Sequence, residues 1–317
     1  YNNIKTSNEI NYKTDIFVAD KMEQVIDRIK NIAMASGFFE TISYNFTSKD
    51  DLLGFKLPQS NWEIKNPVSQ KEPFMATSII PLLVKNVIRN FSRGKKDIKF
   101  FEIGKVFLDT EKTFFSGCVS GCTTGWWGGK PTIVDFYFLK GFIDAVFSEI
   151  GISNYQFDKS DNETFHKNQS VKIKISNRTV GNLGLINPEI KTKLNMETDL
   201  YVFEVSLDEV AVSANFGRKY SPVPKFPSAE RDVAIEVSQG FNVEEIMDAI
   251  KDEGGVMLSD VKLFDFYSGE QITEGYKSIA FRLTFRSKDR TLKDEEINGV
   301  MKKVISQLER KFNAKIR

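Results

Sequence analysis

Hydrophobic side chains recur at helical spacing in three stretches of the first half of the chain. Residues 21–36 carry apolar side chains three and four positions apart, and Gly37 is a suitable stop after them. A second helix is predicted over residues 79–91, capped by Ser78, and a third over residues 136–150. Each of these helices has one apolar face, which indicates packing against a core.

Apolar and polar residues alternate with a period of two between and after these helices, which is typical of strands. Residues 40–46 alternate in this way and predict a half-buried strand with Ile42, Tyr44 and Phe46 on one face. Further strands are predicted at 98–109, 169–176, 179–186 and 200–206. The fold class of this part is therefore α+β, with strands paired mostly antiparallel.

Residues 214–228 contain three prolines and no periodicity, which is typical of an extended linker. We therefore predict a first domain over residues 1–213 and a second over residues 229–317. The second shows the order strand, helix, strand, strand, helix and short strand, with these ranges: 231–237, 243–253, 256–267, 278–286 and 294–312, then the C-terminus. This β-α-β-β-α-β order is ferredoxin-like.

Such a sheet packs helices on one face and leaves the other open. In the strand over 278–286, Ile279, Phe281, Leu283 and Phe285 form the set expected to face the helices. Arg282 and Arg286 then share the open face. On the preceding strand, Lys262, Phe264 and Phe266 form an alternating set that would place rings beside the arginines, in a register that can slip by one.

The 317 residues include 44 basic and 43 acidic side chains, so no global field attracts nucleic acid and any anion site must be local. The densest basic feature is the strip over residues 277–293, where Asp289 alone opposes these cations: Lys277, Arg282, Arg286, Lys288, Arg290 and Lys293. Cations beside phenylalanines suit single-stranded RNA. A solvated strand edge is the alternative, and residues 222–317 together carry 16 basic and 17 acidic side chains.

Metal, membrane and secretion functions find little support in the residues. Cys118, Cys122 and the single histidine, His166, cannot supply four zinc ligands. No stretch of 18 apolar residues occurs, and the two cysteines fit a reducing, cytoplasmic location. The polar opening without methionine is expected for an internal cut, so the chain is interpreted as a piece of a longer protein.

Several motifs resemble one known family. KFPSAERDVAIEV, with VKLFDFYSGEQITEGYKSIAFRLTFRSKDRTLKDEEIN, is similar to the ferredoxin-fold anticodon-binding domain at the end of bacterial phenylalanyl-tRNA synthetase β chains. The class II synthetase-like domain of the same family resembles upstream stretches: GFFETISYNF, RGKKDIKFFEIGKVF, DFYFLKG and VGNLGLINPE. Nearly the whole chain is covered, so the predicted fold is a class II synthetase-like antiparallel sheet domain followed by a ferredoxin-like domain.

The resemblance implies that the chain binds tRNA(Phe) and supports a catalytic α subunit in a tetramer of two α and two β chains. ATP and Mg²⁺ would serve the complete enzyme, with no cofactor expected on this chain alone. Editing and accessory modules would precede Tyr1. The positions chosen for tRNA contact are Lys225, Arg282, Arg286, Lys288 and Arg290, with Phe264 and Phe266 as stacking surfaces. Leu83, Val87 and Phe91 lie on a helix that resembles the class II dimer-interface helix, and ordinary core packing is the alternative for them.

The family comparison also implies that this chain has no catalytic residues. Active class II enzymes hold the amino-acyl phosphate with an arginine two positions before a glutamate, and here Phe100 stands in that place before Glu102. The glycines around Gly121–Gly129 are followed by Lys130-Pro131 and supply no second arginine. Without fixed cations the phosphate charge would be unstabilised, so no adenylate chemistry is predicted. A free-standing RNA-binding or scaffolding protein is the alternative, and a synthetase acting alone is disfavoured.

Overall fold

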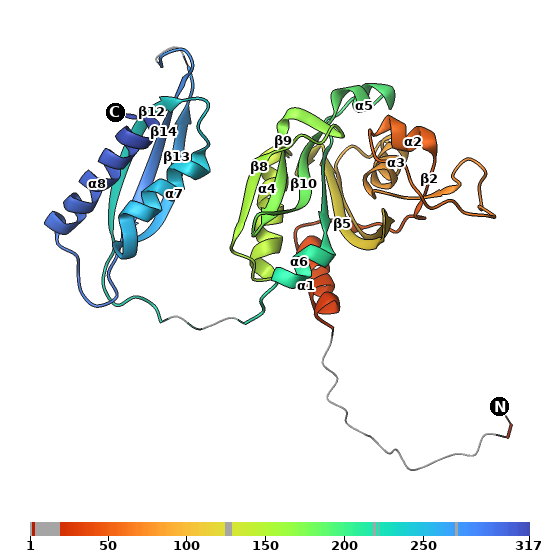
Figure 1. Ribbon diagram of the computed structural model, residues 1–317, viewed down its shortest axis with the longest axis horizontal. Helices are drawn as coiled ribbons and strands as arrows, with labels where there is room; N and C mark the ends of the chain where they lie inside the picture. Colours follow the sequence, from red (N-terminus) through yellow and green to blue (C-terminus); the bar gives the residue numbers. More distant parts are fainter. Residues whose placement is uncertain (1, 4–19, 124–128, 218–219, 221, 270–271) are drawn as a thin grey trace. The chain divides into compact units, whose positions relative to one another are not determined.

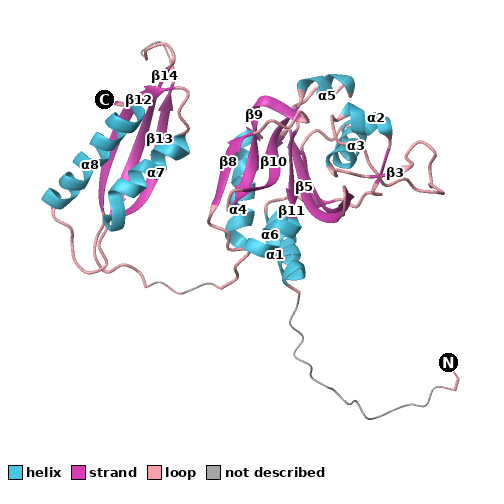
Figure 2. Cartoon of the chain, viewed as in Figure 1, coloured by secondary structure: helices cyan, strands magenta, loops and turns pink. Residues whose placement is uncertain are grey.

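The structure is a computed structural model that describes residues 2–3, 20–123, 129–217, 220, 222–269 and 272–317. The chain divides into two compact units, Tyr1–Arg218 and Lys219–Arg317, called unit 1 and unit 2 below. The division falls within the predicted linker at 214–228, whose own bounds stay a prediction. Figure 2 shows that each unit is a sheet with helices packed against it.

Unit 1 is built on a seven-stranded sheet with the order β1-β4-β5-β11-β10-β9-β8. The bounds of these strands, in sheet order, are Phe39–Glu40, Ile98–Phe107, Glu111–Ser120, Tyr201–Ser206, Arg178–Ile186, Phe165–Ile175 and Tyr155–Lys159. Every neighbouring pair is antiparallel except β1 with β4, which is parallel. The predicted α+β class with mostly antiparallel pairing is therefore confirmed.

Helices cover this sheet on both faces. One core contains buried residues of α1 (Lys21–Ala35), α4 (Phe136–Glu149) and α6 (Leu207–Ser213). The other contains those of α3 (Ile80–Phe91) and α5 (Pro188–Lys193), with Phe55 from the end of α2 (Lys49–Gly54). Two short pairs complete the unit: β2 (Phe46–Thr47) with β3 (Phe74–Met75), and β6 (Cys122–Thr123) with β7 (Thr132–Ile133).

The half-buried Glu204 joins α3 to the sheet. Glu204 of β11 accepts hydrogen bonds from Ser78 Oγ at 3.0 Å, from the Ile79 backbone N–H at 2.8 Å and from Ser116 Oγ at 3.1 Å. Two of these donors lie at the start of α3, where backbone N–H groups have no partner within the helix. Burial raises the pKa of Glu204 although these bonds act to lower it.

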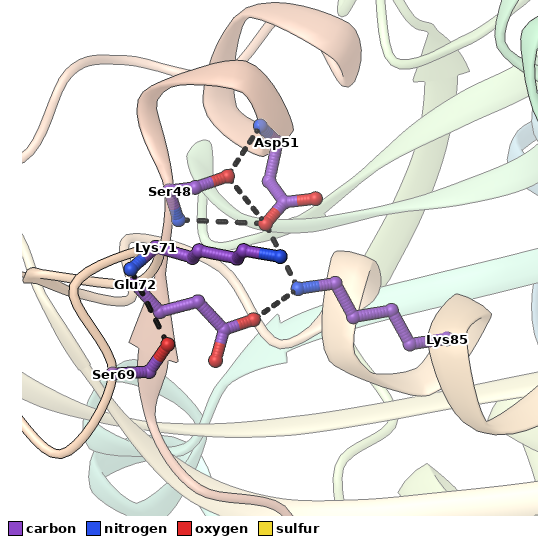
Figure 3. Close-up of polar contacts among 6 residues, drawn as sticks. All are labelled: Ser48, Asp51, Ser69, Lys71, Glu72 and Lys85. Carbon is purple, nitrogen blue, oxygen red and sulfur yellow. Dashed lines mark hydrogen bonds and ion pairs between the residues drawn. The ribbon is translucent and has the colours of Figure 1, made fainter.

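A lysine on α3 holds two other segments of unit 1 together (Figure 3). Lys85 Nζ lies 2.8 Å from Asp51 Oδ2 of α2 and 2.7 Å from Glu72 Oε1 of the loop before β3. Asp51 also closes a capping box with Ser48 at the start of α2. Burial raises the pKa of Asp51, but the bonds from Lys85 and Ser48 outweigh it and leave the pKa lowered. The cluster therefore fixes the loop 56–73 at both ends.

The predicted strand over residues 40–46 is wrong in its extent and its burial. Only Phe39–Glu40 and Phe46–Thr47 are strand, and Ile42 and Tyr44 are 93% and 85% exposed. The residues between them instead turn their polar side chains inward. The buried carboxylate of Glu102 accepts hydrogen bonds from Thr41 Oγ1 at 2.9 Å and from the Ser43 backbone N–H at 2.8 Å.

Unit 2 has the predicted ferredoxin-like order. Its elements are β12 (Ala229–Ser238), α7 (Val243–Gly254), a 3₁₀ turn (Gly255–Met257), β13 (Leu258–Tyr267), β14 (Tyr276–Phe285), α8 (Asp294–Phe312) and β15 (Lys315–Ile316). The sheet order is β13-β14-β12-β15, with antiparallel pairs throughout. Both helices lie on one face of this sheet (Figure 1) and bury its apolar side chains. The other face is open.

We expect that replacing Glu204 by glutamine will remove part of the pH dependence of stability. The ordinary glutamate pKa is near 4.5, and the folded value lies above it. The unfolded chain therefore loses this proton at lower pH than the folded chain. The free energy of unfolding then falls as the pH rises from the ordinary value through the raised one. Glutamine does not titrate, so Glu204→Gln should lack this decline.

Urea unfolding at several pH values, from about pH 4 to 8, would measure the difference between the two proteins. Glu309→Gln, at an exposed position on α8, is the matched control and should keep the slope of the parent. Equal slopes in the parent and Glu204→Gln would contradict the prediction.

Candidate nucleic-acid and partner surfaces

The predicted alternation of β14 is confirmed. Ile279, Phe281, Leu283 and Phe285 are buried in the core of unit 2, whereas Arg282 is exposed on the open face. Because side chains of a strand alternate between the two faces of a sheet, the apolar set that packs against α7 and α8 fixes the direction of Arg282. The arginine reaches the open face as expected.

Arg282 is not a free cation on that face. It pairs with Asp232, directly opposite on β12, through two bonds of 2.8 Å from Nε and Nη2 to the two carboxylate oxygens. Glu230 lies 3.7 Å away on the same strand. The Arg282 bonds lower the pKa of Asp232 and raise that of the arginine. This bidentate pair fixes the guanidinium plane and cancels its charge.

A β-bulge separates the two candidate stacking rings. The register between β13 and β14 shifts between Leu263 and Asp265. Phe264, at the shift, lies beside Arg282, whose guanidinium carbon is 5.1 Å from the ring centroid. Phe266 lies opposite the core residue Ile279, and cross-strand partners share a face, so Phe266 is on the helix side. The predicted alternation required both rings to lie on one face. They do not.

The other cations of the basic strip have different surroundings. Lys277 is buried and donates to the backbone carbonyls of Gln239 and Phe241 at 3.3 and 2.5 Å, and burial lowers its pKa. Arg290 forms two bonds to Glu296 of α8, at 2.7 and 2.5 Å, which lower the pKa of Glu296 to about 2. Two of the six cations of the strip, Arg282 and Arg290, are therefore paired with acids from other elements.

Three exposed lysines near these positions have different surroundings from the paired arginines. Lys225, Lys262 and Lys288 are exposed, and the structure gives none of them an ion pair within the described part of unit 2. Arg286 is only half-exposed, and its Nε is buried without a hydrogen-bond partner among those residues. The sequence-based choice of tRNA contacts thus includes paired arginines and free lysines.

The three candidate partner residues on α3 lie in the core of unit 1. Leu83 and Val87 have no exposed surface, and Phe91 is partly buried against the same core. The intramolecular alternative therefore accounts for Leu83 and Val87. A partner interface elsewhere on unit 1 is untouched by this result.

An exposed apolar segment lies at the edge of the unit 1 sheet, where a half-buried strand was predicted. Phe39, Ile42 and Tyr44 are 71%, 93% and 85% exposed, and β1 is the edge strand. Large exposed apolar side chains gathered in one segment indicate an interaction surface. The signal was present in the alternation of residues 40–46, but alternation alone does not say which set faces the core. The hydroxyl groups of Thr41 and Ser43 bond to the buried Glu102, so the polar set faces inward.

β4 is the strand on which an active class II synthetase would carry the arginine that holds the amino-acyl phosphate. Phe100 and Phe101 precede the buried carboxylate of Glu102, which is occupied by Thr41 and Ser43. In the glycine-rich segment Gly121–Gly129, Gly125 and Gly128 lie outside the described residues. Within the described ranges, no three His, Cys, Asp or Glu side chains come together as a metal-binding group. No helix in the same ranges has the length and apolar character needed to span a bilayer.

Comparison with known proteins follows the division of the fold. A family model described as phenylalanyl tRNA synthetase beta chain CLM domain matches residues 12–207, and one described as ferredoxin-fold anticodon binding domain matches residues 224–317. A solved pyrrolysyl tRNA synthetase from Desulfitobacterium hafniense has a TM-score of 0.47 and 14% identity, over 60% of this chain and 67% of that one. We base no conclusion on that structural similarity.

Curated relatives carry one name. The phenylalanine–tRNA ligase beta subunit of Clostridium acetobutylicum is 32% identical over 94% of this chain and 38% of its own length. That of Clostridium tetani is 31% identical over 100% of this chain and 40% of its own length. The chain thus spans about two fifths of these relatives. Because the first family model covers more than half of it, the chain belongs to the phenylalanyl-tRNA synthetase β-chain family.

Proposed function

We propose that this chain is the C-terminal part of a phenylalanine–tRNA ligase β subunit, which binds tRNA(Phe) and supports a separate catalytic α subunit. The observation that carries the proposal is the match of both units, in order, to the two domains of one subunit. The complete enzyme would contain two α and two β chains and act in the cytoplasm. Attachment of phenylalanine to tRNA would use ATP and Mg²⁺ at the α subunit.

The residues of β4 do not fit ATP and magnesium. Phe100 offers no positive charge to a phosphate, and the carboxylate of Glu102 on the same strand is buried and already accepts hydrogen bonds. Fixed cations are the main means by which a protein stabilises charge that develops on phosphates. The role we propose for this chain in the reaction is therefore binding and support.

Unit 2 offers two kinds of contact to a single-stranded RNA loop. Lys225, Lys262 and Lys288 are free to neutralise phosphates. Arg282 and Phe264 offer flat surfaces, since the arginine is held flat by Asp232 and lies over the ring. Unstacked bases of RNA loops bind such surfaces by stacking. We therefore assign charge neutralisation to the lysines and base stacking to the Arg282–Phe264 pair.

This assignment predicts different salt dependences for the two kinds of contact. Replacing Lys262 or Lys288 by glutamine should weaken tRNA binding and flatten the plot of log affinity against log salt by about 0.7 per lysine, because fewer counterions are released. Phe264→Ala should weaken binding by about 1–3 kcal/mol with little change of slope. Filter binding or fluorescence titration at several salt concentrations measures both quantities.

Lys302→Gln is the control, because Lys302 is exposed on α8, on the covered side of the sheet. It should bind tRNA like the parent. If Lys262→Gln and Lys288→Gln also keep the parent affinity and slope, the open face of unit 2 is not the RNA site.

Unit 1 offers a surface to the α subunit. We assign this contact to the exposed segment of Phe39, Ile42 and Tyr44, because it is the largest run of exposed apolar side chains beside a sheet edge in the described part of unit 1. The relatives are named as a β subunit, so a second kind of chain is the occupant that their name implies. Exposed apolar groups of this size gain from burial in an interface.

A charge in this segment should weaken assembly. Ile42→Asp is expected to reduce α-subunit affinity by about 2 kcal/mol or more, because the carboxylate would be desolvated in the contact. Ile42 is almost fully exposed, so the thermal midpoint of the isolated chain should not change. Val68→Asp, also on an exposed apolar residue of unit 1, is the matched control. Co-elution with the α subunit in Val68→Asp but not in Ile42→Asp would support the assignment, and equal co-elution would exclude it.

The function as a whole is tested by purifying the complete gene product gently from its host and measuring which amino acid the material attaches to total tRNA. Phenylalanine attachment in the presence of a second chain would support the proposal. A protein that is recovered alone and attaches nothing would instead favour a free-standing RNA-binding scaffold.

A further inference from the structure

A cavity in unit 1 has no part in the function proposed above. It has a volume of about 790 Å³ and lies between the end of β8 with residues 160–163 after it, β9, and residues 187–189 at the start of α5. Lys56, at the end of α2, closes it on one side. The chain's single histidine, His166, lines its wall.

The charges around this cavity are divided between two ends. At one end Lys56 pairs with Glu189 at 2.7 Å, and that bond, with Glu163 nearby, raises the pKa of Lys56. This end therefore contains two carboxylates, Glu163 and Glu189, and one lysine. The second end contains Lys159, Lys167 and Lys172 with Asp161 as the acid beside them.

None of these three lysines forms an ion pair among the described residues of unit 1. Lys159 and Lys167 are exposed, and Lys172 is half-buried on β9. The carboxylate opposite Lys172, Asp158 of β8, pairs with Lys174 at 2.5 Å. Three lysines against Asp161 leave an excess of two positive charges at this end.

The polar wall of the cavity is held in place by hydrogen bonds. The Asn168 backbone N–H donates to His166 Nδ1 at 3.1 Å, which leaves the ring proton on Nε2 in the neutral tautomer. Asn187 Nδ2 donates to the Glu163 carbonyl at 2.7 Å, and Ser160 Oγ donates to Asn182 Oδ1 at 2.9 Å. The segment between β8 and β9 is thus fixed to β10 and to the residue that precedes α5.

We propose that the lysine end of this cavity binds a phosphate monoester, with Lys159, Lys167 and Lys172 around the phosphate and His166 Nε2–H as a donor beside it. A phosphate monoester carries between about one and a half and two negative charges at neutral pH, which matches the local excess. A phosphodiester, such as an internal phosphate of RNA, carries about one negative charge and matches this excess less well. The group comes either from a free nucleotide or from the 5′ end of an RNA. The inference does not rest on the proposed function.

The single histidine makes the test direct. In the 317-residue chain labelled at histidine Cε1, one imidazole NMR signal reports the cavity. Titration with inorganic phosphate at constant pH and ionic strength should move this signal to a saturating position. Lys167→Gln and Lys172→Gln should each raise the apparent Kd about tenfold, whereas Lys302→Gln on unit 2 should leave it unchanged.

A signal that does not move, or one that moves equally in Lys167→Gln, Lys172→Gln and the parent, would overturn the site. Thermal midpoints of the variants show that each is folded, and sodium sulfate at equal ionic strength shows whether the response belongs to phosphate. An equal response to sulfate would reduce the site to a general anion site and overturn the assignment to phosphate.

Two further titrations distinguish the sources. AMP against adenosine tests a free nucleotide, and a tRNA with its 5′ phosphate against the same tRNA after dephosphorylation tests an RNA end. A response to AMP alone assigns the site to a nucleotide, and a response lost on dephosphorylation assigns it to an RNA end. Saturation by inorganic phosphate with no response to either ester would overturn the ester proposal. These results are independent of phenylalanine attachment, so a failure of the proposed function would leave them unchanged.

Discussion

Neighbouring residues of β11 enter two different cores. Phe203 and Val205 pack with α1 and α4, whereas Val202, directly before Phe203, packs with α3. A strand that is apolar on both sides must be covered on both faces, as in this sheet. Burial on both faces leaves the sheet itself only its edges and connecting loops for contact with other molecules. The exposed segment beside β1 and the cavity beside β8 and β9 lie at these two edges.

The sheet of unit 2 is covered by helices on one face only. Its helices bury the apolar set of β14, and the other face remains polar because it meets solvent. A polar face of a sheet brings side chains from neighbouring strands within bonding distance of each other. Arg282 and Asp232 are separated by 50 positions in the chain, yet they form a bidentate pair. The charge of a sheet face is thus set across strands, and a count along one strand misjudges it.

This difference explains how far the sequence could predict the molecule. The order of elements and the buried set of β14 followed from periodicity, because a sheet with one apolar face admits only one direction for each side chain. The segment 40–46 failed because its apolar and polar sets alternate equally well. The buried carboxylate of Glu102, about sixty positions away, selected the polar set. The charge of the basic strip was misjudged in the same way at Arg282 and Arg290, since their partners Asp232 and Glu296 come from other elements.

The bulge at Phe264 also bears on the solubility of unit 2. β13 is an edge strand, and four of its large apolar side chains are exposed: Leu263, Phe264, Phe266 and Tyr267. A long, flat edge of this kind would be a template for pairing with the edge of another molecule, which leads to aggregation. A bulge bends and twists the strand and interrupts its regular hydrogen-bonding pattern. The irregularity that separates the two phenylalanine rings thereby protects an aromatic edge from joining a second sheet.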